Sequence, residues 1–375
     1  MSDPRNAQLA EQLVGYSLGV KPAELLYLEV KGIGALDLAR DVVDATTRAG
    51  GVPVLIYHDE GVYRGFWAEA GEAQIKEYAA AHMDLMKRAD TFLSIRGSDN
   101  PFDLQGVGEA QMALMGKHFV NPVHMQQRLN NTRWCVLRYP NSAMAVMAHR
   151  NQRDFDQFFY DVCCLDYSKL SNAMDPLIRL LERTDQVHIE SPGTDLRFSI
   201  EGIGAVKCDG HRNIPDGEVY TAPVKDSVEG TITYNTGSIH KGNLYDGISL
   251  TFEKGRIVKS TCRVGDPDKL AQAFAQDEGA AYVGEFAFGL NPHITRAMQD
   301  ILFDEKISGS IHFTPGNAYE TADNGNRSEL HWDLVLIQTP DQGGGTISLD
   351  GKRVREDGLF ITDDLGPLNP ESLLE

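Results

Sequence analysis

The first half of the chain alternates short apolar runs with longer segments of helical spacing. The runs ELLYLEV (24–30), GVPVLIYHD (51–59), DTFLSIRG (90–97) and RWCVLRYP (133–140) are typical of buried strands. The segment at 71–90 has the apolar spacing of a long helix. Strands that alternate with helices of this length predict right-handed βαβ units around a mostly parallel sheet. We therefore expect an open α/β domain over residues 1–150.

The pattern changes twice further along the chain. Residues 151–184 contain two segments of helical spacing and no strand pattern, which predicts a helical bridge. From 185 onward, runs such as VHIESPGTDLRFSIEG (187–202) alternate apolar and polar residues and are broken by turn pairs. The pair Asp350–Gly351 predicts a late hairpin. Residues 185–375 are therefore predicted to form a mostly antiparallel β domain of α+β type.

The composition is typical of a globular protein. A chain of 375 residues with 42% hydrophobic and 24% charged residues is long enough for two domains with cores of their own. No apolar run is long enough to span a membrane, and the first residues lack the pattern of a secretory signal. The five cysteines are odd in number and show no CxxC spacing, which is typical of reduced thiols in a cytoplasmic protein.

The net charge of −19 argues against a nucleic-acid partner, because phosphate neutralisation needs a basic surface. A negative field attracts cations, including metal ions and substrates with a free ammonium group. An acidic surface that only keeps the protein soluble would explain most of the charge equally well.

The stretch from Tyr282 to Leu336 carries the densest set of candidate metal ligands. His331 and Asp333 lie two apart in HWDLVLI, so a strand would place both on one face. Glu285 stands in an apolar run, where a buried carboxylate is costly unless it is paired or bound to a metal. Taken singly, such residues are ordinary: a solvated turn acid, a core histidine, a surface pair. The candidate set as a whole is Glu218, Glu285, Glu305, His312, Tyr319, His331 and Asp333.

Four motifs in this order resemble the thermophilic aminopeptidase (aminopeptidase T) family of dinuclear metallopeptidases. They are GEV with TAP at 217–223, GE at 284–285, DE at 304–305 with a later His and Tyr, and HWD at 331–333. The resemblance covers nearly the whole chain, since LGVKPAELLYLEV, RWCVLRYPNSAMA and SPGTDLRFSIEG also have counterparts in the family. It implies an aminopeptidase that acts on peptides with a free N-terminus, and a homodimer with active sites facing an internal cavity.

The resemblance also implies roles for individual residues. The implied metal ligands are Glu218, Glu285, Glu305, His312, His331 and Asp333. Their charges give an independent count: four carboxylates and two neutral imidazoles balance two divalent ions, with Glu285 as the bridging carboxylate. We expect zinc, cobalt or manganese. Tyr319 is expected to donate a hydrogen bond to the developing oxyanion, and Glu218 is the candidate proton carrier.

Two features depart from the family pattern and keep alternatives open. The spacing from Glu305 to His312 is longer than in the aminopeptidases. The phrase FAFGLNPHI (286–294) resembles instead the 2,5-dihydroxypyridine dioxygenases, which hold one non-haem iron on the same fold. Those enzymes carry a histidine where this chain has Glu285, but His312, His331 and Asp333 could still supply an iron triad. A catalytically silent binding protein is a third possibility, although every metal-type residue is present.

Overall fold

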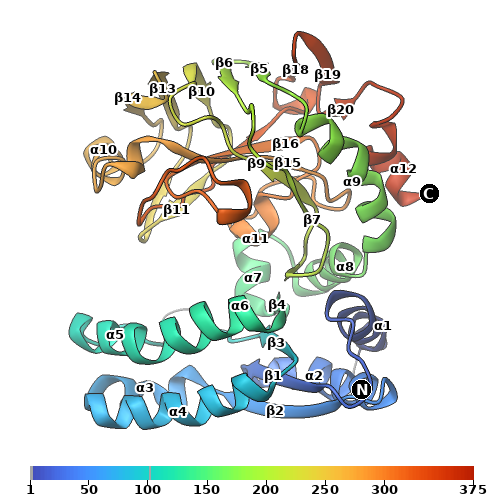
Figure 1. The fold of residues 1–375 in the computed structure, drawn as a ribbon, viewed down its shortest axis with the longest axis vertical. Coiled ribbons are helices and arrows are strands. Elements are labelled where there is room, and N and C mark those ends of the chain that lie inside the picture. The colour runs from blue at the N-terminus through green and yellow to red at the C-terminus, as the bar shows by residue number, and fades with distance from the viewer. Residues whose placement is uncertain (1–2, 101–102) are drawn as a thin grey trace. The chain divides into compact units, whose positions relative to one another are not determined.

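The computed structural model describes residues 3–100 and 103–375. The chain divides into two compact units (Figure 1). Unit 1 comprises residues 1–165 and 210–215, and unit 2 comprises residues 166–209 and 216–375. The segment predicted as a helical bridge therefore holds one helix of each unit, α8 (Gln152–Cys163) in unit 1 and α9 (Tyr167–Leu181) in unit 2.

Unit 1 is built on a parallel sheet, as the alternating pattern predicted. Five strands of the described chain form this sheet in the order β2-β1-β3-β4-β8. All of its strand pairs are parallel. Strand β8 was not anticipated, because it is only two residues long and is supplied by the segment that returns to unit 1. The strands are β1 (Leu25–Lys31), β2 (Val52–His58), β3 (Thr91–Arg96), β4 (Arg133–Arg138) and β8 (Asn213–Ile214).

Helices cover this sheet, and aromatic residues fill the space between the sheet and α4. Tyr27 of β1 and Phe92 of β3 are neighbours in register, and both are fully buried in a cluster with Trp67 and Phe119. The helices of unit 1 besides α8 are α1 (Arg5–Gln12), η1 (Leu13–Ser17), η2 (Ile33–Ala35), α2 (Leu36–Arg48), α3 (Glu60–Glu69), α4 (Glu72–Arg88), α5 (Glu109–Met115), η3 (Gly116–Arg128), α6 (Leu129–Asn131) and α7 (Ser142–Met147).

Unit 2 consists of antiparallel sheets, which confirms the predicted fold class. In the described residues, the larger sheet, sheet B, has the strand order β14-β13-β10-β6-β5-β18-β19-β20. Its strands are β5 (Gln186–Ser191), β6 (Thr194–Ser199), β10 (Glu229–Thr233), β13 (Ser249–Glu253), β14 (Arg256–Thr261), β18 (Thr346–Leu349), β19 (Lys352–Glu356) and β20 (Leu359–Phe360). The hairpin predicted at Asp350–Gly351 is confirmed: both residues have positive φ, 48° and 76°, and they join β18 to β19.

The second sheet, sheet C, has the order β17-β16-β15-β9-β7 in the described chain. Its strands are β7 (Val206–Cys208), β9 (Glu218–Thr221), β15 (Val283–Gly289), β16 (Ser310–Pro315) and β17 (Val335–Ile337). The remaining elements of unit 2 are β11 (Ser238–His240), β12 (Asn243–Tyr245), α10 (Pro267–Ala273), η4 (Gly279–Ala281), α11 (Ile301–Asp304), η5 (Glu320–Ala322), η6 (Pro340–Gln342), η7 (Gly366–Leu368) and α12 (Pro370–Leu374).

Phenylalanines from both sheets form the core of unit 2. The ring of Phe198 on β6 lies 5.1 Å from the rings of Phe286 on β15 and Phe313 on β16. Because side chains alternate along a strand, Glu285 and His312, which precede these phenylalanines, face away from sheet B. The apolar residues beside the candidate ligands therefore belong to the core, and the ligands lie on the opposite face of sheet C.

Candidate metal centre

Neighbouring strands of sheet C bring the first three candidate ligands together. Glu218 opens β9 opposite Gly289 of β15, and His312 of β16 lies opposite Ala287 of β15. The Nε2 atom of His312 is 2.9 Å from Oε1 of Glu285 and 3.4 Å from Oε2 of Glu218. One donor atom from each of the three residues lies within 4.8 Å of the others. All three side chains are buried, so this is an interior cluster.

A second group meets the first at Glu285. His331 Nε2 is 3.6 Å from Oε2 of Glu285 and 3.3 Å from Oδ1 of Asp333. The donor atoms of these three residues also lie within 4.8 Å of one another. His331 and Asp333 do not lie within a strand as expected. They precede β17 in an extended segment, where His331 forms a single bridge to Gly316. The two side chains nevertheless meet, and Glu285 belongs to both groups.

Backbone carbonyls orient both histidines. The Nδ1 atom of His312 lies 3.1 Å from the carbonyl oxygen of Glu305, and that of His331 lies 2.9 Å from the carbonyl oxygen of Asn317. A carbonyl can only accept, so each Nδ1 carries a proton and each Nε2 faces the carboxylates. In the charged ring Nε2 donates to a carboxylate, and in the neutral ring its lone pair is available to a metal ion. Thr314 Oγ1 donates to Oδ1 of Asp333 at 2.7 Å and fixes that carboxylate as well. These contacts are the outer support that metal ligands usually have.

The carboxylates create a negative potential that attracts positive charge. Burial acts to lower the pKa of His312, but its hydrogen bond to Glu285 and the charge of Glu218 outweigh burial and raise it to about 9. The pKa of His331 is raised to about 10 against the effect of burial, chiefly by Asp333. Burial also raises the pKa of Glu285. The cluster therefore takes up protons, or metal ions in their place.

Two carboxylate oxygens in the cluster have no hydrogen-bond donor in the described part of the chain. They are Oε2 of Glu218 and Oε2 of Glu285, and both are buried. A buried oxygen without a partner is costly, and metal coordination would satisfy it. Carboxylates with imidazoles are also the donor set that zinc, cobalt and manganese accept. The residues at this position thus fit a divalent metal site.

A buried lysine lies beside the cluster, which the sequence did not lead us to expect. Lys306 is fully buried, and its Nζ atom is 3.6 Å from Oε1 of Glu218 and 4.0 Å from Oδ1 of Asp216. It also forms an ion pair with Glu305. A third group of possible ligands, Cys208 with Asp216 and Glu218, lies on this side. In the sequence, a lysine next to two acids looks like a solvated residue, so no signal could have found it.

The structure places the other two candidate residues at the edge of the cluster. The Glu305 side chain pairs with Lys306, and its carboxylate is in none of the three groups within the described residues. Burial raises its pKa to about 8, which Lys306 opposes. Tyr319 precedes η5, its ring centroid lies 4.8 Å from that of His331, and 47% of its surface is exposed. A half-exposed tyrosine beside His331 is able to contact a bound molecule.

A buried cluster of histidines and carboxylates on an antiparallel sheet places the chain among metal-dependent enzymes. The model of the family described as Thermophilic metalloprotease (M29) matches residues 2–358, and the chain therefore belongs to this family. It is a metallopeptidase, a hydrolase, and the resemblance to the aminopeptidase T family is confirmed.

Relatives support the same assignment along the whole chain. Aminopeptidase PepS of Streptococcus thermophilus is 26% identical, over 93% of this chain and 91% of that protein. Aminopeptidase T of Thermus thermophilus is also 26% identical, over 94% and 95%. The solved structure of wild-type AmpT from Thermus thermophilus has a TM-score of 0.77 at 22% identity, covering 96% of this chain and 99% of that chain.

The fold is shared with an oxygenase as well. The 2,5-dihydroxypyridine dioxygenase of Pseudomonas putida KT2440 has a TM-score of 0.62 at 14% identity, and the match covers 96% of this chain and 98% of that chain. At this identity the likeness shows the fold alone. In the described residues, no helix is both long and apolar enough to cross a membrane.

Proposed function

We propose that the chain is an aminopeptidase that works with two divalent metal ions, with Glu285 bound to both. The observation that carries this proposal is the position of Glu285, which is the common member of two ligand groups. Glu218 and His312 would hold one ion, and His331 and Asp333 the other. Each group offers donor atoms within 4.8 Å of one another, and Glu285 directs Oε1 to one group and Oε2 to the other.

The charges around the cluster support two ions over one. The proposed ligands include the four carboxylates of Glu218, Glu285, Glu305 and Asp333. The structure adds one acid, Asp216, and one ammonium group, that of Lys306, and these two cancel. Four negative charges remain for the metal ions, which is the charge of two divalent cations. Glu305, which lies beside Lys306, is the sixth proposed metal ligand.

When bound, the two ions would lower the pKa of a shared water and polarise the scissile carbonyl. The histidines keep their Nε2 lone pairs directed at the site through the two carbonyl contacts. Glu218 is the proposed proton carrier, because its Oε2 accepts no hydrogen bond in the described structure. Zinc, cobalt and manganese all suit this donor set.

Tyr319 is the proposed donor to the oxyanion. Loss of water around its hydroxyl group, and then the charges of Glu285 and Asp333, raise its pKa. The phenol therefore keeps its proton throughout the neutral range and can donate a hydrogen bond. One such donor is typically worth roughly 3 kcal/mol in the transition state.

The substrate we propose is a peptide with a free N-terminus. The relatives named above are aminopeptidases and match this chain over more than nine-tenths of its length. The acidic net charge of −19 suits a substrate that carries an ammonium group. A cytoplasmic homodimer completes the proposal, on the grounds of the reduced cysteines and the family resemblance.

An iron-dependent ring-cleaving dioxygenase is the second candidate. It is favoured by the shared fold and by the phrase FAFGLNPHI. The additional carboxylate of Glu285 disfavours the dioxygenase. One iron ion held by two histidines and one carboxylate would leave the negative charges of the other buried acids without a counter-charge.

One experiment separates these functions. Metal content per chain is measured by elemental analysis on protein purified without a metal-binding tag, together with hydrolysis of aminoacyl-arylamides and oxygen uptake with hydroxylated pyridines. The proposal predicts about two zinc, cobalt or manganese ions per chain and arylamide hydrolysis. About one iron per chain with oxygen uptake would replace it by the dioxygenase.

A further inference from the structure

Three basic side chains stand side by side at one edge of the parallel sheet in unit 1. Lys31 ends β1, Arg96 ends β3 and Arg138 ends β4. The strand register pairs Lys31 with Arg96, and Arg96 with Arg138. Neighbouring parallel strands in register direct such side chains to the same face, at a strand separation of about 4.8 Å. The sheet therefore carries a continuous row of positive charge, which we call the basic row.

The basic row lies where open α/β sheets hold ligands. The strand order β2-β1-β3 means that the chain leaves β1 toward one side of the sheet and later returns on the other. Ligands of such sheets bind beyond the carboxyl ends of the strands at this reversal point. Here the backbones that follow β1 and β3 are in close contact: a Cβ atom added to Gly32, whose φ is 82°, would lie 2.4 Å from the carbonyl oxygen of Gly97. Arg96 and Arg138, which end in this region, are exposed.

The acids of unit 1 contact Lys31 and Arg96 differently, and the buried carboxylate of Glu29 shares its negative charge with both. Lys31 Nζ pairs with Oε1 of Glu60 at 3.0 Å. Arg96 donates from Nε to Ser94 Oγ over a long 3.5 Å, and in the described residues no carboxylate oxygen lies within 4.0 Å of its guanidinium. Like charges in register on adjacent strands repel each other. An anion that neutralises Arg96 would remove this repulsion.

A buried guanidinium lies behind the basic row. Arg128 is 8% exposed, and its Nε and Nη1 atoms are buried without an acceptor in the described structure. It packs over Trp134 at 4.6 Å and Phe92 at 5.4 Å, residues that lie four positions before Arg138 and Arg96 on the same strands. Burial, and after it the positive charge of Arg96, lower the pKa of Arg128 to about 10. In the part of the chain that the structure describes, neither Arg96 nor Arg128 has a carboxylate in contact with its guanidinium group.

We propose that the basic row is a second ligand site, which binds a small oxyanion with several charges, of phosphate or carboxylate type. Arg96 and Arg138 hold the anion from the edge, Lys31 flanks it, and Arg128 adds positive charge from behind. The planar fork of a guanidinium group matches two oxygens of a phosphate or a carboxylate, which a lysine ammonium does not. The site is formed by unit 1 alone and is independent of the proposed metal chemistry.

The test is anion protection against an arginine reagent. The metal-loaded protein is labelled with phenylglyoxal at fixed ionic strength, and each modified arginine is quantified by peptide mass spectrometry. Inorganic phosphate and tricarballylate are the probes, with chloride as the reference. We expect one of the two probes to slow labelling of Arg96 and Arg138 at least fivefold, and the effective probe identifies the type of anion. Equal rates with and without both probes would overturn the proposal, as would a failure of Arg96 to react at all.

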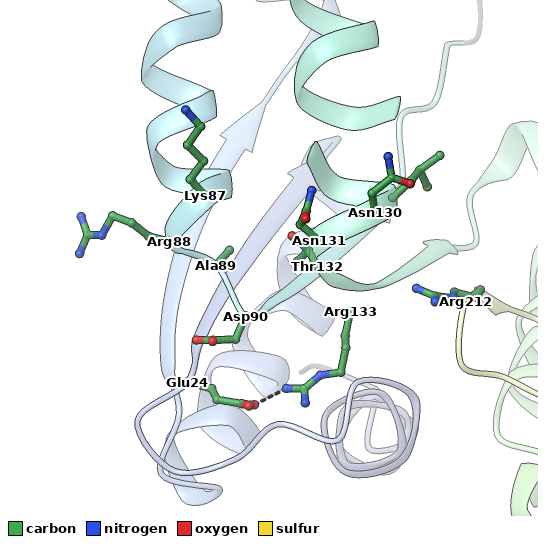
Figure 2. A pocket seen from close by; sticks show the side chains of 11 residues that line it. Glu24, Lys87, Arg88, Ala89, Asp90, Asn130, Asn131, Thr132, Arg133 and Arg212 are labelled. Carbon is green, nitrogen blue, oxygen red and sulfur yellow. Dashed lines mark hydrogen bonds and ion pairs between the residues drawn. The ribbon is translucent and has the colours of Figure 1, made fainter. Parts of the chain in front are cut away.

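A control arginine separates specific binding from general screening. Arg88 is also exposed and lies in the last turn of α4, at the opposite edge of the same sheet. Figure 2 shows Arg88 among the residues that line a hollow of about 480 Å³, in which Arg133 pairs with Glu24. The probes should leave labelling of Arg88 unchanged. Equal slowing at Arg88 and Arg96 would mean that the anion acts by screening alone, and would contradict the proposal.

Matched variants complete the test. Arg96→Gln and Arg88→Gln each remove one exposed guanidinium group. The proposal predicts that Arg96→Gln abolishes protection of Arg138 and that Arg88→Gln preserves it. Thermal melting of both variants checks that the fold is intact. Full protection of Arg138 in a folded Arg96→Gln protein would show that the arginines do not share one ligand.

Discussion

Replacing Glu285 by glutamine removes the carboxylate on which the proposed metal centre depends. The substitution keeps the size of the side chain and deletes one negative charge at a position that is 4% exposed. Its two oxygens serve different partners, since Oε1 lies 2.9 Å from His312 Nε2 and Oε2 lies 3.6 Å from His331 Nε2. One change therefore affects both ligand groups at once.

These distances allow an estimate of the loss in metal-binding free energy. Unit charges about 3–4 Å apart attract each other by about 5 kcal/mol at an effective dielectric constant of about 20. A divalent ion bound at Nε2 would be attracted by the carboxylate at least as strongly as a unit charge. Its binding free energy should therefore weaken by at least about 5 kcal/mol when the carboxylate becomes an amide. Because about 1.4 kcal/mol corresponds to a factor of ten, we expect the affinity for metal to fall by at least about 10³.

The assay measures metal content after dialysis against micromolar zinc, followed by hydrolysis of an aminoacyl-arylamide. Glu285→Gln should retain at most one ion per chain and should lose turnover. The matched control is Glu329→Gln, which removes an exposed acid two residues from His331 and should retain both metal and activity. Normal metal content and turnover in Glu285→Gln would refute the assignment of a shared ligand.

Three further predictions follow from the same geometry. Tyr319→Phe should lower kcat about 100-fold with unchanged metal content, as expected for the loss of one oxyanion donor; loss of metal in this variant would instead make Tyr319 a ligand. Lys306→Met should lower the free energy of unfolding by about 3–5 kcal/mol, because it leaves buried carboxylates without their ammonium partner; a urea titration that shows less than about 1 kcal/mol would contradict this role. In metal-free protein, His312 and His331 have pKa values raised to about 9 and about 10, above that of an unfolded histidine. Their contribution to stability is therefore complete below about pH 6.5 and is lost as the pH rises toward 10, with a slope of up to about 1.4 kcal/mol per pH unit for each group. Melting curves should show this loss after chelation, and an equal pH dependence of the metal-loaded protein would contradict it.

The strands were the part of the fold that the sequence predicted best. Runs such as ELLYLEV and DTFLSIRG became β1 and β3 because continuous apolar runs can only be buried between layers. The Asp350–Gly351 turn was predictable from local chemistry, since both residues adopt positive φ. The division of the chain was less predictable. The segment 210–215 returns to unit 1, and a strand of two residues gives no periodic signal.

Five of the seven candidate residues lie together in the cluster, and their roles as metal ligands stay a prediction. The apolar run around Glu285 predicted that this acid is buried, and the structure confirms it. Spacing could not tell that His331 and Asp333 meet just before β17 and not within it. It also could not reveal the ammonium of Lys306, because a buried lysine is recognised only by the carboxylates that the fold places around it.

Anomalous diffraction from crystals soaked in zinc tests the central claim most directly. Data collected on both sides of the zinc absorption edge locate each ion independently of the protein. The account predicts two peaks per chain, one beside Glu218 and His312 and the other beside His331 and Asp333, with Glu285 in contact with both. A single peak, or two peaks of which only one contacts Glu285, would contradict it.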